Sequence, residues 1–199
     1  MSLFNPTSAP SVMAGGLVVW EKIFTSAELD AIEKYGDRLT LEKAGLVARN
    51  SGRDGIRVTK VAWFERNAET EAFYARVEEI VLRLNAQFFR FDLSGLVSFQ
   101  YAFYDGTEGG YFDWHKDYGK DYAAPDQEPR KLSLSIQLSD PGAYQGGDLE
   151  VRAGNMVDVA PKARGTAVAF PSYVLHRVTP ITSGARKSLV VWAVGPEFK

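Results

Sequence analysis

The pattern of hydrophobic and polar positions divides the chain into a helical first half and a β-rich second half. In the first half, apolar side chains recur at helical spacing in two segments, which predicts two helices. The first predicted helix follows Thr25, because Thr25 and Glu28 match a capping box. Leu29, Ile32 and Tyr35 then supply the apolar positions of this helix.

The second predicted helix covers residues 67–88, with Asn67 as its cap and an apolar stripe along one side. Each predicted helix is preceded by a short apolar run that is typical of a strand, Leu17–Ile23 in one case and Arg57–Phe64 in the other. Residues 1–15 are rich in Pro, Ser and Ala, and we expect an extended arm there.

After residue 91 the helical periodicity stops, and short β-rich runs alternate with turns that contain Gly, Pro, Asp or Asn. Several short strands with this spacing predict a sandwich or barrel. The runs are Leu96–Tyr104, Lys131–Leu138, Asp148–Val151, Met156–Val159, Thr166–Phe170, His176–Val178 and Ser188–Val194. We therefore predict one α+β domain over residues 1–199, in which 1–95 form the arm, strands and supporting helices and 96–195 form the β core.

Composition narrows the function classes without naming one. The 199 residues are enough for a single domain with a sizeable core. A formal net charge of −2 gives no basic face for nucleic acid. The chain has no cysteine, which excludes a disulfide framework, a thiolate metal site and a cysteine nucleophile. No signal-peptide pattern or membrane-length apolar run is present, so we expect a cytoplasmic protein with no membrane partner.

The two histidines of the chain, His115 and His176, fall into one pattern with Asp117. In a strand, residues two apart point to the same face, so His115 and Asp117 can aim an imidazole and a carboxylate at one point. A second imidazole from His176 would complete two histidines and one carboxylate on one side of a metal ion. That ligand set leaves coordination positions open and is associated with Fe(II) oxygenases.

A third element follows His176 at a distance of ten residues. Arg186 presents a planar fork that binds a carboxylate through two hydrogen bonds. Ser188 lies two residues further on, hence on the same face of a strand. Together these side chains can anchor the far carboxylate of a 2-oxo acid whose other end chelates a metal.

These residues resemble the motifs of the 2-oxoglutarate/Fe(II)-dependent dioxygenases, and within them the prolyl 4-hydroxylase-like branch. The family pattern of His-x-Asp, a distant His and Arg-x-Ser appears as His115/Asp117, His176 and Arg186/Ser188. The surrounding segments are also similar over about residues 96–195. They are Phe103-Tyr104-Asp105-Gly106, Gly110-Tyr111-Phe112, Leu138-Ser139-Asp140, Tyr144-Gln145-Gly146-Gly147-Asp148-Leu149, Phe170-Pro171 and Val190-Val191-Trp192.

The resemblance implies a double-stranded β-helix core of the jelly-roll or cupin type, with N-terminal supporting helices. It implies Fe(II), 2-oxoglutarate and O2, with ascorbate as a candidate reductant, and the release of succinate and CO2 as an unactivated C–H bond is hydroxylated. Tyr104 matches a family tyrosine near the iron and cosubstrate. Gln137 stands where some relatives have a tyrosine that helps to hold the distal carboxylate, so Arg186 and Ser188 would carry more of the anchoring.

The substrate stays open at this level, between a prolyl or other peptidyl residue and a free amino acid or similar small molecule. One alternative function is a metal-binding cupin-like barrel without oxygenase activity, which has no need of Arg186 and Ser188. Another is nucleic-acid demethylation of the AlkB type. Those enzymes have a second arginine six residues after the first, where this chain has Trp192. The oligomeric state is not readable from the sequence.

Two polar segments are candidates for loops that cover the pocket, Ala44–Arg57 and Tyr118–Arg130. The first contains Arg49, Arg53 and Arg57, which suggests anionic substrate groups. Trp63 and Trp192 are interpreted as core residues.

Overall fold

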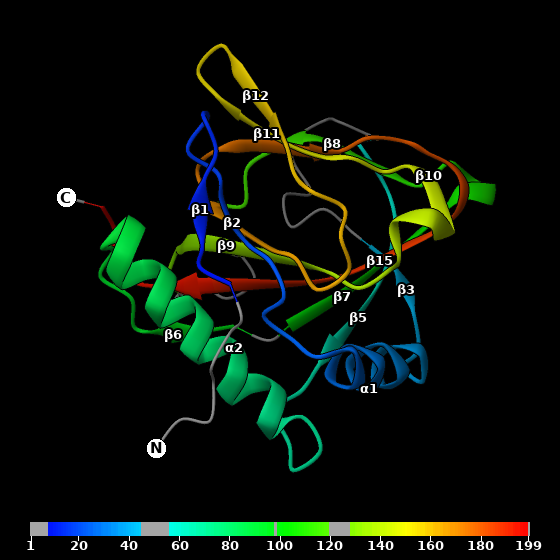
Figure 1. Cartoon of the computed structure of the whole chain (residues 1–199), viewed down its shortest axis with the longest axis horizontal. Coiled ribbons are helices and arrows are strands. Elements are labelled where there is room, and N and C mark those ends of the chain that lie inside the picture. The colour runs from blue at the N-terminus through cyan, green and yellow to red at the C-terminus, as the bar shows by residue number, and fades with distance from the viewer. Residues whose placement is uncertain (1–7, 45–55, 98, 120–127, 199) are drawn as a thin grey trace.

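The computed structural model describes residues 8–44, 56–97, 99–119 and 128–198 (Figure 1). Part of the predicted arm and parts of both predicted cover loops lie outside the described residues, and so do Arg49 and Arg53. Within the described ranges, no helix is long and apolar enough to cross a membrane.

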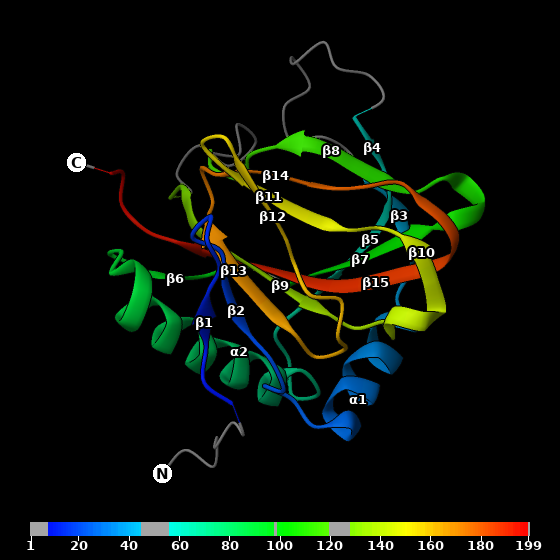
Figure 2. The same cartoon turned by 45° about the horizontal axis from the view of Figure 1, so that its top comes forward.

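Two β-sheets make up most of the described structure. In spatial order, the larger sheet contains β1 (Ser11–Val12), β2 (Val18–Trp20), β13 (Ala167–Pro171), β9 (Arg130–Gln137), β15 (Ile181–Val194), β7 (Phe99–Asp105), β5 (Lys60–Phe64) and β3 (Glu42–Lys43), while β10 (Tyr144–Gly146) and β6 (Gly95–Leu96) also pair with β15. The smaller sheet contains β12 (Met156–Val159), β11 (Leu149–Ala153), β14 (Leu175–Val178), β8 (Tyr111–His115) and β4 (Arg57–Val58). Figure 2 shows β11, β14 and β8 facing β9, β15 and β7.

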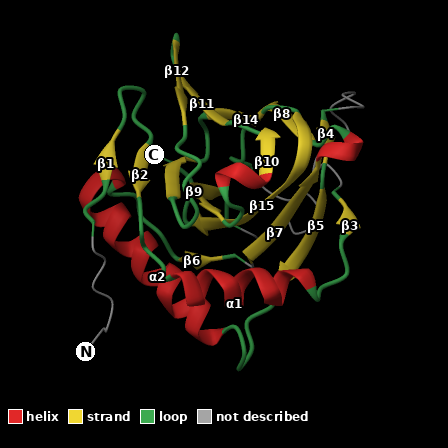
Figure 3. Cartoon of the chain, turned by 45° about the vertical axis from the view of Figure 1, so that its right-hand side comes forward, coloured by secondary structure: helices red, strands yellow, loops and turns green. Residues whose placement is uncertain are grey.

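The larger sheet separates two hydrophobic cores. One core lies between this sheet and the two helices, α1 (Ser26–Asp37) and α2 (Glu71–Leu84), and the other lies between the two sheets. Figure 3 shows both helices on the side of the larger sheet that faces away from the smaller one. The predicted α+β class with supporting helices and a β core is confirmed by this arrangement.

The helices differ in how closely they follow the sequence pattern. The capping box of Thr25 and Glu28 is present at the start of α1. The second helix begins at Glu71 instead of Asn67, because the Asn67 side chain accepts from the backbone of Glu69 and Thr70 and holds a turn there. The chain then continues through a π-helical turn, Asn85–Phe89, and two short 3-10 turns occur later, Gly106–Glu108 and Pro141–Ala143.

Strand β15 is the centre of the larger sheet and orients the interior. It is 14 residues long and pairs antiparallel with β7 on one side and β9 on the other. Because side chains alternate along a strand, Leu189 and Val191 point to the helices while Arg186 and Ser188 point between the sheets. On β9 the same alternation directs a row of polar side chains between the sheets, namely Ser133, Ser135 and Gln137.

The attachment of β10 to β15 depends on Gly184. Tyr144 of β10 lies opposite Gly184 in the register. Gly184 has φ +70, and a Cβ placed on it would lie 2.0 Å from the carbonyl oxygen of Ala143. Only glycine meets both requirements without strain.

We predict that Gly184→Ala destabilises the protein by about 2 kcal/mol or more, because the new methyl group pushes β10 away from β15 and φ is unfavourable for alanine. Chemical denaturation monitored by circular dichroism measures the change. Gly142→Ala is the matched control, since nothing lies within 4 Å of its Cβ position. Equal stability of the two variants would contradict this role of Gly184.

Candidate active site

The two histidines of the chain face each other on neighbouring strands. His115 ends β8 and lies opposite His176 of β14 in the register, with 4.0 Å between the ring centroids. Asp117 follows β8, and its backbone N–H donates to the carbonyl oxygen of Ser172 at 2.9 Å. The Asp117 carboxylate then lies 3.4 Å from Nε2 of His176 and 3.7 Å from Nε2 of His115. One potential ligand atom from each residue lies within 4.8 Å of the other two.

Backbone carbonyl groups fix the tautomers of both imidazoles. Nδ1 of His115 lies 2.7 Å from the carbonyl oxygen of Asp113, and Nδ1 of His176 lies 3.1 Å from that of Val174. A carbonyl oxygen only accepts, so each Nδ1 carries the hydrogen and each Nε2 presents its lone pair to the cluster. Histidines that bind metals have this arrangement, in which the second ring nitrogen donates to an oxygen acceptor.

The charges in the cluster also fit a divalent cation. Burial foremost, and then the adjacent His176, lower the pKa of His115 to about 3. Burial alone would raise the pKa of Asp117, but the neighbouring imidazoles, that of His176 foremost, hold this pKa well below its usual range. At neutral pH, His115 is therefore neutral and Asp117 is ionised. Imidazole and carboxylate in this combination suit Fe(II) and similar ions.

Asp117 is held by side chains that the sequence did not single out. The Ser133 hydroxyl donates to Oδ2 of Asp117 at 2.8 Å and lies 2.9 Å from the Ser172 hydroxyl. Trp192 contributes to the low pKa of Asp117, although its indole N–H makes no hydrogen bond of normal geometry. The alternating polar positions of Lys131–Leu138 are the one sequence signal that could have pointed to Ser133.

Arg186 forms the centre of a second cluster. Its side chain is 3% exposed, and Nη1 donates to the Ser188 hydroxyl at 3.1 Å. The guanidinium carbon lies 5.4 Å from the centroid of the Tyr104 ring. Within the described part of the chain, no carboxylate forms an ion pair with Arg186. Because an unpaired buried charge is costly, this guanidinium is suited to an anionic ligand.

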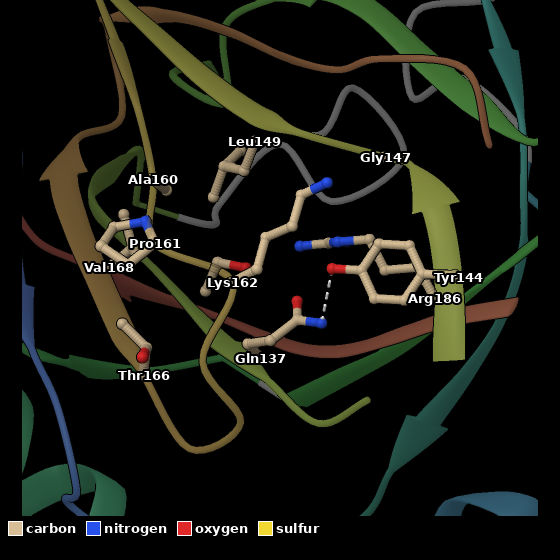
Figure 4. Close-up of a pocket in the computed structure, with 11 residues that line it drawn as sticks. Gln137, Tyr144, Gly147, Leu149, Ala160, Pro161, Lys162, Thr166, Val168 and Arg186 are labelled. Atoms are coloured by element: carbon tan, nitrogen blue, oxygen red, sulfur yellow. Dashed lines mark hydrogen bonds between the residues drawn. The ribbon is translucent and has the colours of Figure 1, made fainter. Parts of the chain in front are cut away.

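Gln137 joins the second cluster through the sheet register, since it lies opposite Ser188. Figure 4 shows Arg186 and Gln137 lining one pocket together with Tyr144 and Lys162. Ser135 lines the same pocket and lies between Gln137 and Ser133 on the inward face of β9. From Ser133 to Gln137 the strand advances about 13 Å, so the two clusters stand at opposite ends of one row.

The structure thus gathers the seven predicted site residues into two clusters. His115, Asp117 and His176 form the first; Arg186, Ser188, Tyr104 and Gln137 form the second. The interpretation of Trp63 as a core residue is wrong, because its side chain is 45% exposed. Trp63 lies 6.1 Å from Trp192 between ring centroids, and Arg130 stacks on Trp192 at 3.9 Å. Trp63 therefore exposes an aromatic ring next to Trp192, at the Asp117 end of the row.

Arg57, one of the three predicted loop arginines, lies beside the first cluster. Its guanidinium stacks on Phe112 at 4.4 Å, and the Phe112 ring stacks on His115 at 3.4 Å. Nη2 donates to the Gln100 side chain at 3.0 Å. Burial lowers the pKa of Arg57, while electrostatic interactions with Tyr104 and Asp117 act in the opposite direction.

Comparison with known proteins identifies the family of the β core. Residues 99–194 match the model of the 2OG-Fe(II) oxygenase superfamily. A PKHD-type hydroxylase of Pseudomonas fluorescens is 34% identical over 88 residues, which cover 43% of this chain. The same match spans only 39% of the length of that relative.

Solved structures extend the likeness of the fold to most of the chain. A prolyl-4-hydroxylase of Pseudomonas putida superimposes with a TM-score of 0.72 at 20% identity, covering 92% of this chain and 94% of that one. A prolyl hydroxylase of Trichoplax adhaerens, solved with a peptide fragment of the hypoxia inducible factor oxygen degradation domain, gives 0.70 at 20% identity over 91% of this chain and 84% of that one. The expected double-stranded β-helix is therefore confirmed. The matched residues 99–194 contain both clusters, and this β core belongs to the 2OG-Fe(II) oxygenase superfamily.

Proposed function

We propose that the protein is an Fe(II)- and 2-oxoglutarate-dependent hydroxylase. In this proposal His115, Asp117 and His176 bind the iron, and Arg186 and Ser188 bind the distal carboxylate of 2-oxoglutarate, with Tyr104 and Gln137 beside them. The observation that carries the proposal is the buried Arg186, which has no carboxylate partner among the described residues. It lies at one end of a row whose other end presents two Nε2 lone pairs and a carboxylate.

The donor set explains why this ion and this cosubstrate fit together. Two neutral imidazoles and one carboxylate leave a divalent ion with a net charge of +1 and with open coordination positions. Bound Fe(II) and 2-oxoglutarate supply O2 activation for hydroxylation of an unactivated C–H bond, with succinate and CO2 as coproducts. Arg186 neutralises the second carboxylate of the cosubstrate away from water, where an unpaired charge is costly. Ascorbate as reductant and a cytoplasmic location remain predictions.

A peptidyl substrate, with a prolyl residue as the first candidate, agrees best with the surface beside Asp117. Trp63 is exposed there and lies against the buried Trp192, on which Arg130 stacks. Flat aromatic faces pack well against an apolar ring, and an arginine can bind peptide carbonyl groups. The Trichoplax adhaerens relative was solved with a peptide. A free amino acid or similar small molecule remains the second candidate substrate.

Two other functions fit the arrangement less well. A cupin-like barrel without oxygenase activity would leave the buried charge of Arg186 without a use. In a nucleic-acid demethylase of the AlkB type, the position of Trp192 would carry an arginine, whereas here its indole supports Asp117. The net charge of −2 also gives no general attraction to nucleic acid.

We expect Asp117→Asn to weaken Fe(II) binding about 100-fold or more under anaerobic conditions, because the ion loses its single anionic ligand. Isothermal titration calorimetry measures the dissociation constant. Asp113→Asn is the matched control: Asp113 is exposed and lies outside the cluster of three candidate ligands, so affinity should not change. Equal affinities for the two variants would rule out Asp117 as a ligand.

Replacing Arg186 by glutamine should raise the KM for 2-oxoglutarate about 100-fold, because the distal carboxylate loses a buried charged partner. The Fe(II) dissociation constant should stay within a factor of about three, since Arg186 lies at the other end of the row. Succinate release measures turnover, and Arg83→Gln on the outer side of α2 serves as the control. A loss of iron binding that matches the rise in KM would contradict the division of roles.

Trp63→Ala should raise the KM for a proline-containing peptide several-fold, because the substrate loses an aromatic contact outside the metal cluster. The slow succinate release that occurs without substrate should be unaffected. Mass spectrometry of a peptide and amino acid panel, read for one added oxygen atom, identifies the substrate first. Hydroxylation of free amino acids alone would overturn the preference for peptides.

A further inference from the structure

The side-chain amide of Gln137 has partners for both of its N–H groups. Nε2 donates to the Tyr144 hydroxyl at 3.0 Å and to the carbonyl oxygen of Ser139 at 3.2 Å. Because a carbonyl oxygen only accepts, the amide atom that faces Ser139 must be the nitrogen, and the orientation of the amide is fixed. Gln137 can therefore present only its own oxygen to an incoming carboxylate, and two acceptors do not form a hydrogen bond.

The Tyr144 hydroxyl, in contrast, has a hydrogen to give. Its oxygen accepts from Gln137, so its own hydrogen points elsewhere. Tyr144 is 5% exposed, and within the described ranges no acceptor takes this hydrogen. Figure 4 shows the hydroxyl directed to the same part of the pocket as the guanidinium of Arg186. A buried donor without an acceptor next to an unpaired buried cation is the environment that a carboxylate would complete.

The segment that carries Tyr144 is held in place by Lys162, which lines the same pocket. Nζ of Lys162 donates to the carbonyl oxygen of Gly146 at 2.7 Å and pairs with Asp148 at 2.9 Å. The same ammonium lies 5.3 Å from the centroid of the Tyr144 ring. Because Asp148 neutralises Lys162, this lysine fixes β10 and leaves Arg186 as the cation without a carboxylate partner among the described pocket residues.

We propose that Tyr144 donates a hydrogen bond to the distal carboxylate of 2-oxoglutarate beside Arg186, and that Gln137 is the residue that positions its hydroxyl. The proposal rests on the proposed function. In this proposal the hydroxyl of Tyr144, on β10, takes the place of the tyrosine hydroxyl that some relatives have at the position of Gln137. It also makes Tyr144 a determinant of specificity for 2-oxo dicarboxylic acids.

Two cosubstrate probes separate this role from a structural one. 2-Oxopentanoate has the same chelating end and chain length as 2-oxoglutarate, but it has a methyl group in place of the distal carboxylate. We would titrate each compound by calorimetry into the full-length protein loaded with Mn(II), which keeps oxidation out of the measurement. Tyr144→Phe should weaken 2-oxoglutarate binding about tenfold, the loss expected for a hydrogen bond to a charged group, and leave 2-oxopentanoate binding within a factor of about two.

Two further variants complete the series. Gln137→Leu keeps the tyrosine but removes the group that aims it, so we expect a smaller loss for 2-oxoglutarate and none for 2-oxopentanoate. Tyr101→Phe removes another buried tyrosine hydroxyl, one that donates to Asp37 on the helix side of the sheet. This control should change the affinity of neither compound.

The outcomes distinguish this proposal from the function on which it rests. A wild-type protein that does not prefer 2-oxoglutarate over 2-oxopentanoate would overturn both. A wild-type preference that Tyr144→Phe retains in full would overturn the role of Tyr144 alone, and so would an equal weakening of both compounds. If Tyr144→Phe binds neither compound, Gln137→Leu decides: a reduced preference supports the proposal and an unchanged preference refutes it.

Discussion

The register of β15 between β7 and β9 is the constraint on which the interior depends. Side chains alternate along a strand, so a slip of one residue would turn Arg186 and Ser188 toward the helices and Leu189 toward the other sheet. The observed register sets Arg186 opposite Tyr104 on one side and Ser188 opposite Gln137 on the other. The apolar side chains that β15 and β9 place against α1 and α2 hold that register, because a slip would expose them to the polar row.

Each end of the row between the sheets holds a buried charge, which is costly unless it is paired. At one end, Asp117 is stabilised as an anion by two imidazoles and by Ser133. At the other end, Arg186 has only the Ser188 hydroxyl as a hydrogen-bond acceptor within the described residues. A ligand that brings a metal cation to the first end and a carboxylate to the second would pair both charges at once. The proposed iron and 2-oxoglutarate form such a pair, and the Tyr144 hydroxyl would complete the carboxylate end.

The sequence predicted the α+β class and five of the cluster residues from local patterns, and it assigned Tyr104 and Gln137 through the family resemblance. His115 and Asp117 are close in sequence, and Arg186 and Ser188 follow His176 at a recognisable distance. The supporting side chains could not be predicted in this way. Ser133 reaches Asp117 because the two sheets face each other, and Tyr144 reaches Gln137 because β10 and β9 both pair with β15. Neither arrangement is visible in one sequence. The prediction that Trp63 is a core residue failed for a related reason. Its side chain is on the inward face of β5, but this face is open to solvent at Trp63.

The central claim is that one ligand joins the two clusters, with its metal-chelating end at His115, Asp117 and His176 and its carboxylate at Arg186. A crystal structure of the protein grown without oxygen in the presence of Mn(II) and 2-oxoglutarate tests this claim most directly. We predict an anomalous difference peak between the three side chains and continuous ligand density from that peak to Arg186. A metal peak elsewhere, or a ligand whose distal carboxylate does not contact Arg186, would contradict the account.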